Sequence, residues 1–146
     1  MKKSKEFIKL CKEYGVDPNK VNEVTSFEAA CAITGDNAGI LPQVSETATR
    51  HQKRLIADYR LSIIADALRG DWKPDYTNYG QWKYFPVFLV EADESCPSGS
   101  ALSYYDCAAW SALSGVGVRL CFPNSDTAIF FANHFINLHV DHHLLT

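Results

Sequence analysis

The sequence predicts an α+β fold: N-terminal helices, a three-stranded antiparallel meander, and a long C-terminal helix packed on the sheet. Two observations support this prediction. Capping residues and helically spaced apolar residues dominate up to Arg69, whereas aromatic and β-branched runs follow Asp71. A chain of 146 residues with 47% hydrophobic residues is also the usual size and composition of one domain. We therefore expect a single α+β domain over residues 1–146, with peripheral helices and a connector in 1–45 and the core in 47–146.

Two short helices are expected first. Ser4 can cap a helix that continues to Tyr14, because its apolar residues form one stripe and a glycine follows. Thr25 and Glu28 have the spacing of a capping box and predict a second helix that ends at Gly35.

The third helix should begin near Thr47 or Thr49 and end at Arg69, with Gly70 just beyond it. Its second half, residues 61–68, is apolar almost all round. Such a helix packs on more than one side, so we expect it at the centre of the core.

Three strands are expected after the helices. Residues 82–90 and 101–108 are rich in aromatic and β-branched residues and are separated by a polar loop with Pro97 and Gly99. Residues 116–122 predict the third strand, because Val118, Leu120 and Phe122 would share one face of it. Three consecutive strands most simply form an antiparallel meander.

The final helix should start within residues 123–126, with Ser125 or Asn124 as its cap, and extend nearly to Thr146. Four apolar residues form its predicted buried stripe: Ala128, Phe131, Phe135 and Leu138.

Charge is distributed unevenly along the chain. Up to Lys83 there are 13 basic and 11 acidic residues, whereas from Tyr84 onward Arg119 is the only basic residue against six acidic ones. Sequence-independent nucleic-acid binding needs several lysine or arginine contacts to phosphates. We therefore do not expect a nucleic-acid partner.

Compartment can be inferred from the cysteines and the apolar runs. The five cysteines form an odd set without a CxxC pair, which favours reduced thiols in a cytosol. The basic start of the chain lacks the apolar run of a signal peptide, because Lys9, Lys12 and Glu13 interrupt it. No run is long enough to cross a bilayer. A cytoplasmic protein without a membrane partner or a cofactor is expected.

The segment from Trp72 to Phe88 holds seven of the eighteen aromatic residues, interleaved with lysine, aspartate and asparagine. Stacking surfaces with a few directed polar groups suit a nucleobase or a sugar. Core packing would explain the same aromatics. Arg119 could receive a phosphate, could be a structural partner of Asp106, or could lie on a solvated face of the sheet. The candidate ligand-binding residues are Trp72, Lys73, Asp75, Tyr76, Lys83, Tyr84 and Arg119.

Catalysis receives little support from sequence motifs. His139 and His143 have a spacing that could hold a metal ion, but no third ligand is evident, and a solvated helix end is the favoured interpretation. Pro74-Asp75 followed by Lys83 faintly resembles a nuclease arrangement without its second acid. A metal-dependent phosphodiesterase is thus a lesser alternative, and we expect a protein that is not an enzyme.

Two stretches carry a resemblance. Residues 67–76, with Trp-Lys-Pro-Asp, continue to Lys-Tyr-Phe-Pro at 83–86, and Val-Arg-Leu-Cys-Phe follows at 118–122. Over residues 25–146 the chain resembles a group of small uncharacterised proteins carried by bacteriophages and prophages of gut bacteria. The resemblance implies a setting in an infected host cell, and it implies nothing about catalytic residues.

That setting leads to the functional expectation. Small phage proteins without catalytic motifs commonly act by binding. We expect a non-enzymatic binder of a nucleotide-like small molecule, a sponge that sequesters a host immune signal. The alternative is a protein-interaction module that inhibits a host factor or belongs to the virion. An open sheet edge would also make a homo-oligomer plausible.

Overall fold

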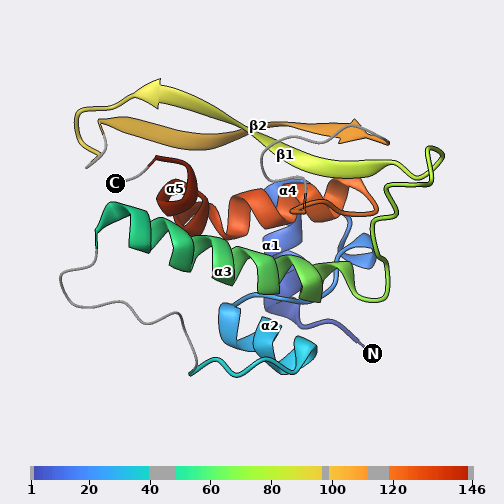
Figure 1. The fold of residues 1–146 in the computed structure, drawn as a ribbon. Helices are drawn as coiled ribbons and strands as arrows, with labels where there is room; N and C mark the ends of the chain where they lie inside the picture. Colours follow the sequence, from blue (N-terminus) through green and yellow to red (C-terminus); the bar gives the residue numbers. More distant parts are fainter. Residues whose placement is uncertain (1, 40–48, 97–98, 112–118, 145–146) are drawn as a thin grey trace.

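Helices lie on one side of the molecule and a two-stranded sheet lies on the other (Figure 1). This computed structural model describes residues 2–39, 49–96, 99–111 and 119–144. The elements are α1 (Lys5–Tyr14), the 3-10 helix η1 (Pro18–Lys20), α2 (Phe27–Thr34), α3 (Arg50–Arg69), β1 (Lys83–Ala92), β2 (Ser100–Trp110), α4 (Ser125–His134) and α5 (Ile136–Leu144).

Local capping chemistry fixes the first helix and the third. The Ser4 side chain accepts a hydrogen bond from the Phe7 amide at 3.2 Å, as expected for an N-cap. Gly15 ends α1 in the left-handed conformation, with φ 71°. Thr49 begins α3, and its capping box uses Gln52 three residues later.

The start of α2 differs from the prediction by one residue. Ser26, not Thr25, is the N-cap, and its hydroxyl accepts a hydrogen bond from the Ala29 amide at 3.1 Å. The carbonyl of Thr25 instead lies 2.8 Å from Nε2 of His134 in α4. A tertiary contact thus separates Thr25 from the helix, and the predicted capping box with Glu28 is wrong.

The sheet has two strands within the described residues, β1 and β2, paired antiparallel with a bulge between Val87 and Phe88. The predicted three-stranded meander is therefore not observed. Residues 116–118 of its third strand lie outside the described residues, Arg119 lies in a turn, and Phe122 makes one isolated bridge with Tyr84. Pro123 and the N-cap Asn124 come next, so the chain turns into α4 before a ladder can extend.

The predicted long C-terminal helix is divided in two at Phe135, whose backbone is not helical (φ −108°, ψ 28°). Just before the break, His134 is held by two distant groups. Its Nδ1 lies 3.0 Å from the Tyr14 hydroxyl, and its Nε2 meets Thr25 as described above. After the break, α5 takes a different direction (Figure 1) and brings His139 against Phe88 of β1. We attribute the break to these two sets of contacts, which a straight helix would not satisfy together.

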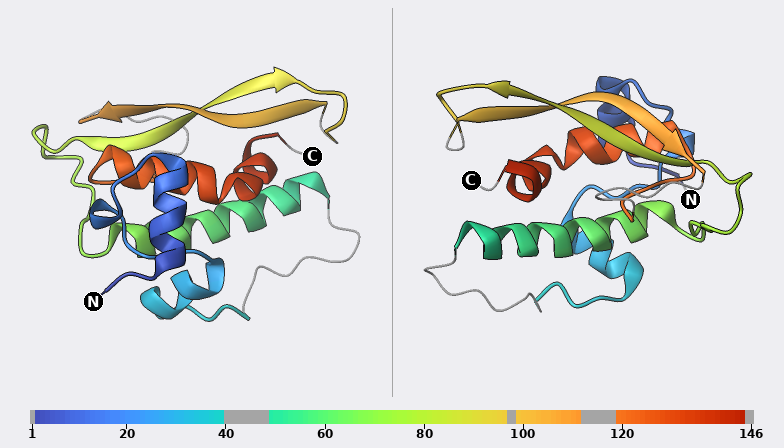
Figure 2. Two further views of the ribbon diagram at one scale, coloured as in Figure 1. Left: turned by 180° about the vertical axis from the view of Figure 1, so that it is seen from behind. Right: turned by 45° about the horizontal axis from the view of Figure 1, so that its top comes forward.

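The helices and the sheet are stacked in layers. Figure 2 shows α4 and α5 between the sheet and α3, with α2 on the far side of α3. Phe7 of α1 packs on Phe130 of α4, with ring centroids 5.3 Å apart. The N-terminal part therefore contributes side chains directly to the core, whereas the sequence predicted peripheral helices there. Its buried members are Phe7, Cys11, Val16, Val21, Val24, Phe27, Ala30 and Cys31.

None of the helices in the described ranges has the length and apolar character needed to span a membrane.

Histidine 139 is a core residue. Its side chain is 1% exposed and lies between the rings of Phe88 and Phe131, each with a centroid 4.7 Å away. Nε2 is 3.2 Å from the carbonyl oxygen of Phe131. Burial, with a smaller contribution from His143, lowers the pKa of His139 from 6.5 to about 3. The neutral imidazole is therefore the form that the core accommodates.

Acidification should destabilise the protein through this residue. The unfolded chain binds a proton on His139 below pH 6.5, whereas the folded chain does not until about pH 3. The stability present above pH 6.5 is thus lost as the pH falls toward 3, by about 2 kcal/mol at pH 5. Urea unfolding at pH 7.5 and at pH 5 gives the free energy of unfolding at each pH. Between these two pH values it should fall by about 2 kcal/mol more in the wild type than in His139→Gln. The exposed His51→Gln should behave like the wild type; equal losses in all three proteins would contradict the prediction.

Candidate functional site

A cleft of about 600 Å³ opens beside Trp72, between the C-terminal ends of α2 and α3 and the segment that follows α3. Its volume is typical of a small-molecule site. Four of its residues are charged, two acidic and two basic. The residues that line it are Ile33, Thr34, Asp66, Arg69, Gly70, Asp71, Trp72, Lys73 and Pro74.

The turn after α3 places Trp72 in this cleft. Gly70 has φ 60° and ψ −128°, a conformation that side-chain-bearing residues rarely adopt. A Cβ there would also lie 3.0 Å from Nδ2 of Asn22, which donates a hydrogen bond to the Leu68 carbonyl at 2.8 Å. The Trp72 amide donates back to the Arg69 carbonyl at 3.2 Å. The turn is thereby fixed, and the indole remains half-buried at the cleft wall.

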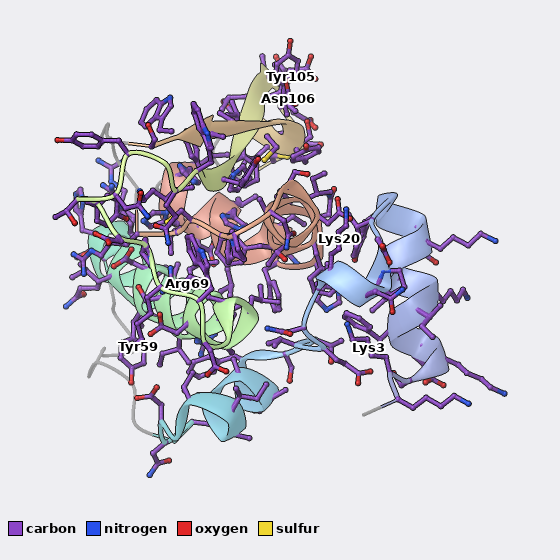
Figure 3. The ribbon with its side chains drawn as sticks, turned by 90° about the vertical axis from the view of Figure 1, so that its right-hand side faces the viewer. Lys3, Lys20, Tyr59, Arg69, Tyr105 and Asp106 are labelled. Carbon is purple, nitrogen blue, oxygen red and sulfur yellow. The ribbon has the colours of Figure 1, made fainter. Side chains whose placement is uncertain are left out.

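Arg69 lines the cleft and connects α3 to the chain before α4. Its Nη1 donates to the carbonyls of Arg119 and Cys121, and its Nη2 is paired with a carboxylate oxygen of Asp66. The side chain is only 11% exposed, whereas that of Asp66 is 63% exposed. Figure 3 shows Arg69 at this end of α3. The guanidinium is mostly used for structure, and the carboxylate of Asp66 remains open to the cleft.

Lys83 is buried, with 2% of its surface exposed, although the sequence predicted a ligand-binding role. Its Nζ donates to the carbonyls of Asp75, Gln81 and Ser111 at 2.7, 2.9 and 2.8 Å. The Asn78 carbonyl is 3.4 Å away, and the Tyr76 ring centroid is 5.3 Å away. An ammonium group has three protons to donate, so all three are used within the protein. Lys83 is not placed to meet an external phosphate.

The loop between Lys73 and Lys83 is held by hydrogen bonds among its own residues. Asp75 accepts hydrogen bonds from the amide and hydroxyl of Thr77 at 2.9 and 2.6 Å, and these bonds lower the pKa of its carboxyl group. The Gln81 side chain accepts from the Asp75 amide at 2.6 Å and donates to the Lys73 carbonyl at 3.0 Å. The loop therefore presents Lys73 from a defined backbone.

Tyr76 points back toward the core at its hydroxyl end, 3.7 Å from Sγ of Cys121. Burial, together with the Cys121 contact, raises the pKa of this phenol to about 12, against the lowering effect of the Arg69 and Arg119 charges. The hydroxyl is thus neutral at physiological pH.

Of the seven candidate residues, the structure brings Trp72 and Lys73 together in the cleft. Tyr84 is half-buried against the core and exchanges backbone hydrogen bonds with Phe122. Arg119 has an exposed side chain in the turn that Arg69 holds, outside the cleft lining. The remaining three belong to the closed loop: Asp75, Tyr76 and Lys83.

The sequence interpretation missed Asp66, Arg69 and Asp71 as site residues. Asp66 and Arg69 are three apart near the end of a helix, a spacing that places two side chains on one face. This spacing, next to Gly70 and Trp72, was the sequence signal that could have identified Asp66 and Arg69 as site residues. The contribution of α2 carries no such signal, because it depends on how α2 packs against α3.

Comparison with protein-family models, with curated proteins and with solved structures finds no match to this chain. Within the described ranges, no group of three or more histidine, cysteine, aspartate or glutamate side chains is arranged to hold a metal ion. The site must therefore be interpreted from its own geometry.

The contrast between two lysines gives a direct test of the loop. Lys83→Met should lower the free energy of unfolding by about 2 to 4 kcal/mol, because it leaves buried carbonyls without donors. Lys73→Met, at an exposed position, should change it by less than about 0.5 kcal/mol. Urea unfolding of both variants measures the difference. Equal small effects would show that the ammonium of Lys83 does not hold the loop.

Proposed function

We propose that the protein binds a nucleotide-like small molecule in the cleft beside Trp72 and does not convert it. The observation that carries this proposal is the convergence of one aromatic face, one exposed ammonium and two carboxylates on a cleft of about 600 Å³. Each of these groups matches a different part of a nucleotide.

The base is the part that Trp72 would recognise. Its indole is half-buried, so the ring is held by packing while one side borders the cleft. Base stacking on aromatic side chains contributes about 1–3 kcal/mol per base and tolerates different bases. The apolar surface of Ile33 and Pro74 in the same lining would help to exclude water from the stacked base.

The phosphate and ribose would meet the charged residues. Lys73 is exposed and borders the cleft, so its ammonium is placed to approach an anionic group. Asp66 and Asp71 are also exposed there, and carboxylates accept hydrogen bonds from ribose hydroxyls. Arg69 contributes mainly by fixing Asp66. With two carboxylates present, a single anionic group or a phosphate distant from them fits better than a triphosphate.

Sequestration is the role that we propose for this binding. This proposal rests on the phage setting that the sequence analysis suggests, and on a sequence that contains no nucleotide-hydrolysing motif such as a Walker loop. A sponge needs affinity and abundance rather than a catalytic group. The proposed ligand is therefore a nucleotide signal of the infected host, held in the cleft and released intact when the protein unfolds.

Calorimetric titration with AMP and with ADP-ribose tests the site. We expect saturable binding to the wild type, with affinity reduced about tenfold or more by Trp72→Ala and by Lys73→Ala. Tyr79→Ala removes an aromatic ring that is 72% exposed and outside the cleft lining, so it should bind like the wild type.

The bound compound should be recovered unchanged after denaturation, as judged by mass spectrometry. Recovery of a hydrolysed product would replace the sponge with an enzyme. Absence of saturable binding for both compounds, or an equal loss in Tyr79→Ala, would contradict the proposed site.

A further inference from the structure

The two-stranded ribbon formed by β1 and β2 is covered on one face. Phe88 of β1 packs on α5, with its ring centroid 4.7 Å from that of His139 and 5.4 Å from that of His143. Helix α4 lies beneath the other part of the ribbon, and no described element covers the opposite face (Figures 1 and 2).

The opposite face carries exposed apolar and aromatic side chains. Val87 and Leu89 flank Phe88 and so point away from the helices; they are 36% and 39% exposed. Val87 pairs with Asp106 and Phe88 pairs with Tyr104, which leaves Tyr105 as the extra residue of the bulge, 66% exposed. Figure 3 shows Tyr105 and Asp106 at the extreme of the molecule, away from the helices.

The free edge of β2 offers main-chain groups to a partner. The strand has eleven residues, and within the described ranges β1 is its only neighbour in the sheet. In an antiparallel pair, alternate residues direct their N–H and C=O groups away from the paired strand. An edge of this length is a template for a further strand.

Charge selects the kind of strand that fits this edge. Residues 84–111 contain four carboxylates, Glu91, Asp93, Glu94 and Asp106, and no lysine, arginine or histidine. The nearest cation along the chain, Lys83, is buried and already paired. Asp106 lies in β2, Glu91 lies in β1, and the other two lie in the loop that connects the strands. A second copy paired through β2 would bring its own set of these carboxylates, and like charges would oppose the pairing. A basic strand would be attracted.

We propose that the edge of β2 is a docking site for an extended segment of a partner protein that alternates apolar residues with lysine or arginine. The segment adds a third strand to the ribbon through main-chain hydrogen bonds. Its apolar side chains extend the surface of Val87, Leu89 and Tyr105, and its cations meet the carboxylates of the ribbon. This site is separate from the cleft beside Trp72, so the two can be tested independently.

The first test uses a fluorescent nine-residue peptide that alternates valine and lysine, followed by anisotropy. Saturable binding is expected, and it should weaken about tenfold or more when glutamate replaces lysine in the peptide. Methylation of alternate peptide nitrogens, which removes main-chain donors, should abolish binding. Hydrogen exchange should slow at amides of β2 when the unmodified peptide is bound.

Matched variants of the protein complete the test. The double variant Glu91→Lys with Asp106→Lys should weaken binding of the valine–lysine peptide about tenfold or more. Glu13→Lys with Glu28→Lys makes the same change in net charge at exposed positions of α1 and α2, and should bind as the wild type does. Equal binding of the methylated peptide, equal loss in both double variants, or absence of saturable binding would overturn the proposal. Dimerisation through β2 that excludes the peptide would overturn it as well.

Discussion

Donation from buried and half-buried cationic side chains to main-chain carbonyls holds the irregular parts of this chain together. Lys3 donates to the carbonyls of Pro18 and Val21, Arg69 to those of Arg119 and Cys121, and Lys83 to those of Asp75, Gln81 and Ser111. Carbonyls in a loop have no ladder of N–H groups to pair with, and leaving them unpaired in the interior is costly. A long side chain with several donors satisfies two or three of them at once. Figure 3 shows Lys3 near the start of α1 and Arg69 at the end of α3.

The candidate site depends on this constraint. Arg69 and Lys83 hold the two ends of the segment that contains Trp72 and Lys73, and the hydrogen bonds of Gln81 close the loop between them. A loop whose backbone is fixed loses little conformational entropy when a ligand binds. Two of the cations that the sequence suggested for ligand recognition therefore differ in their use. Lys83 holds the loop, and Lys73 remains exposed at the cleft.

Local chemistry made part of the fold predictable. The helix caps at Ser4 and Thr49 depend on residues three positions apart, so a sequence pattern identifies them. The predicted third strand and the unbroken final helix are not confirmed, because both depend on distant contacts. His134 is tied to Tyr14 and to the segment before α2, and Phe122 makes one bridge before the chain turns into α4. In the candidate site, Trp72 and Lys73 lie in the lining of one cleft because they are adjacent in sequence, and their role in binding a ligand remains a prediction. The position of Lys83 was not predictable, because its acceptors come from separate places along the chain.

The indole N–H signals of the three tryptophans provide the most direct measurement of the central claim. In a titration of isotope-labelled protein with AMP followed by NMR, we expect the Nε1 signal of Trp72 to shift saturably. The signals of Trp82, before β1, and Trp110, at the end of β2, should remain in place because neither residue lines the cleft. A saturable shift at Trp82 or Trp110 without one at Trp72, or no shift in any of the three, would contradict a nucleotide-binding cleft beside Trp72.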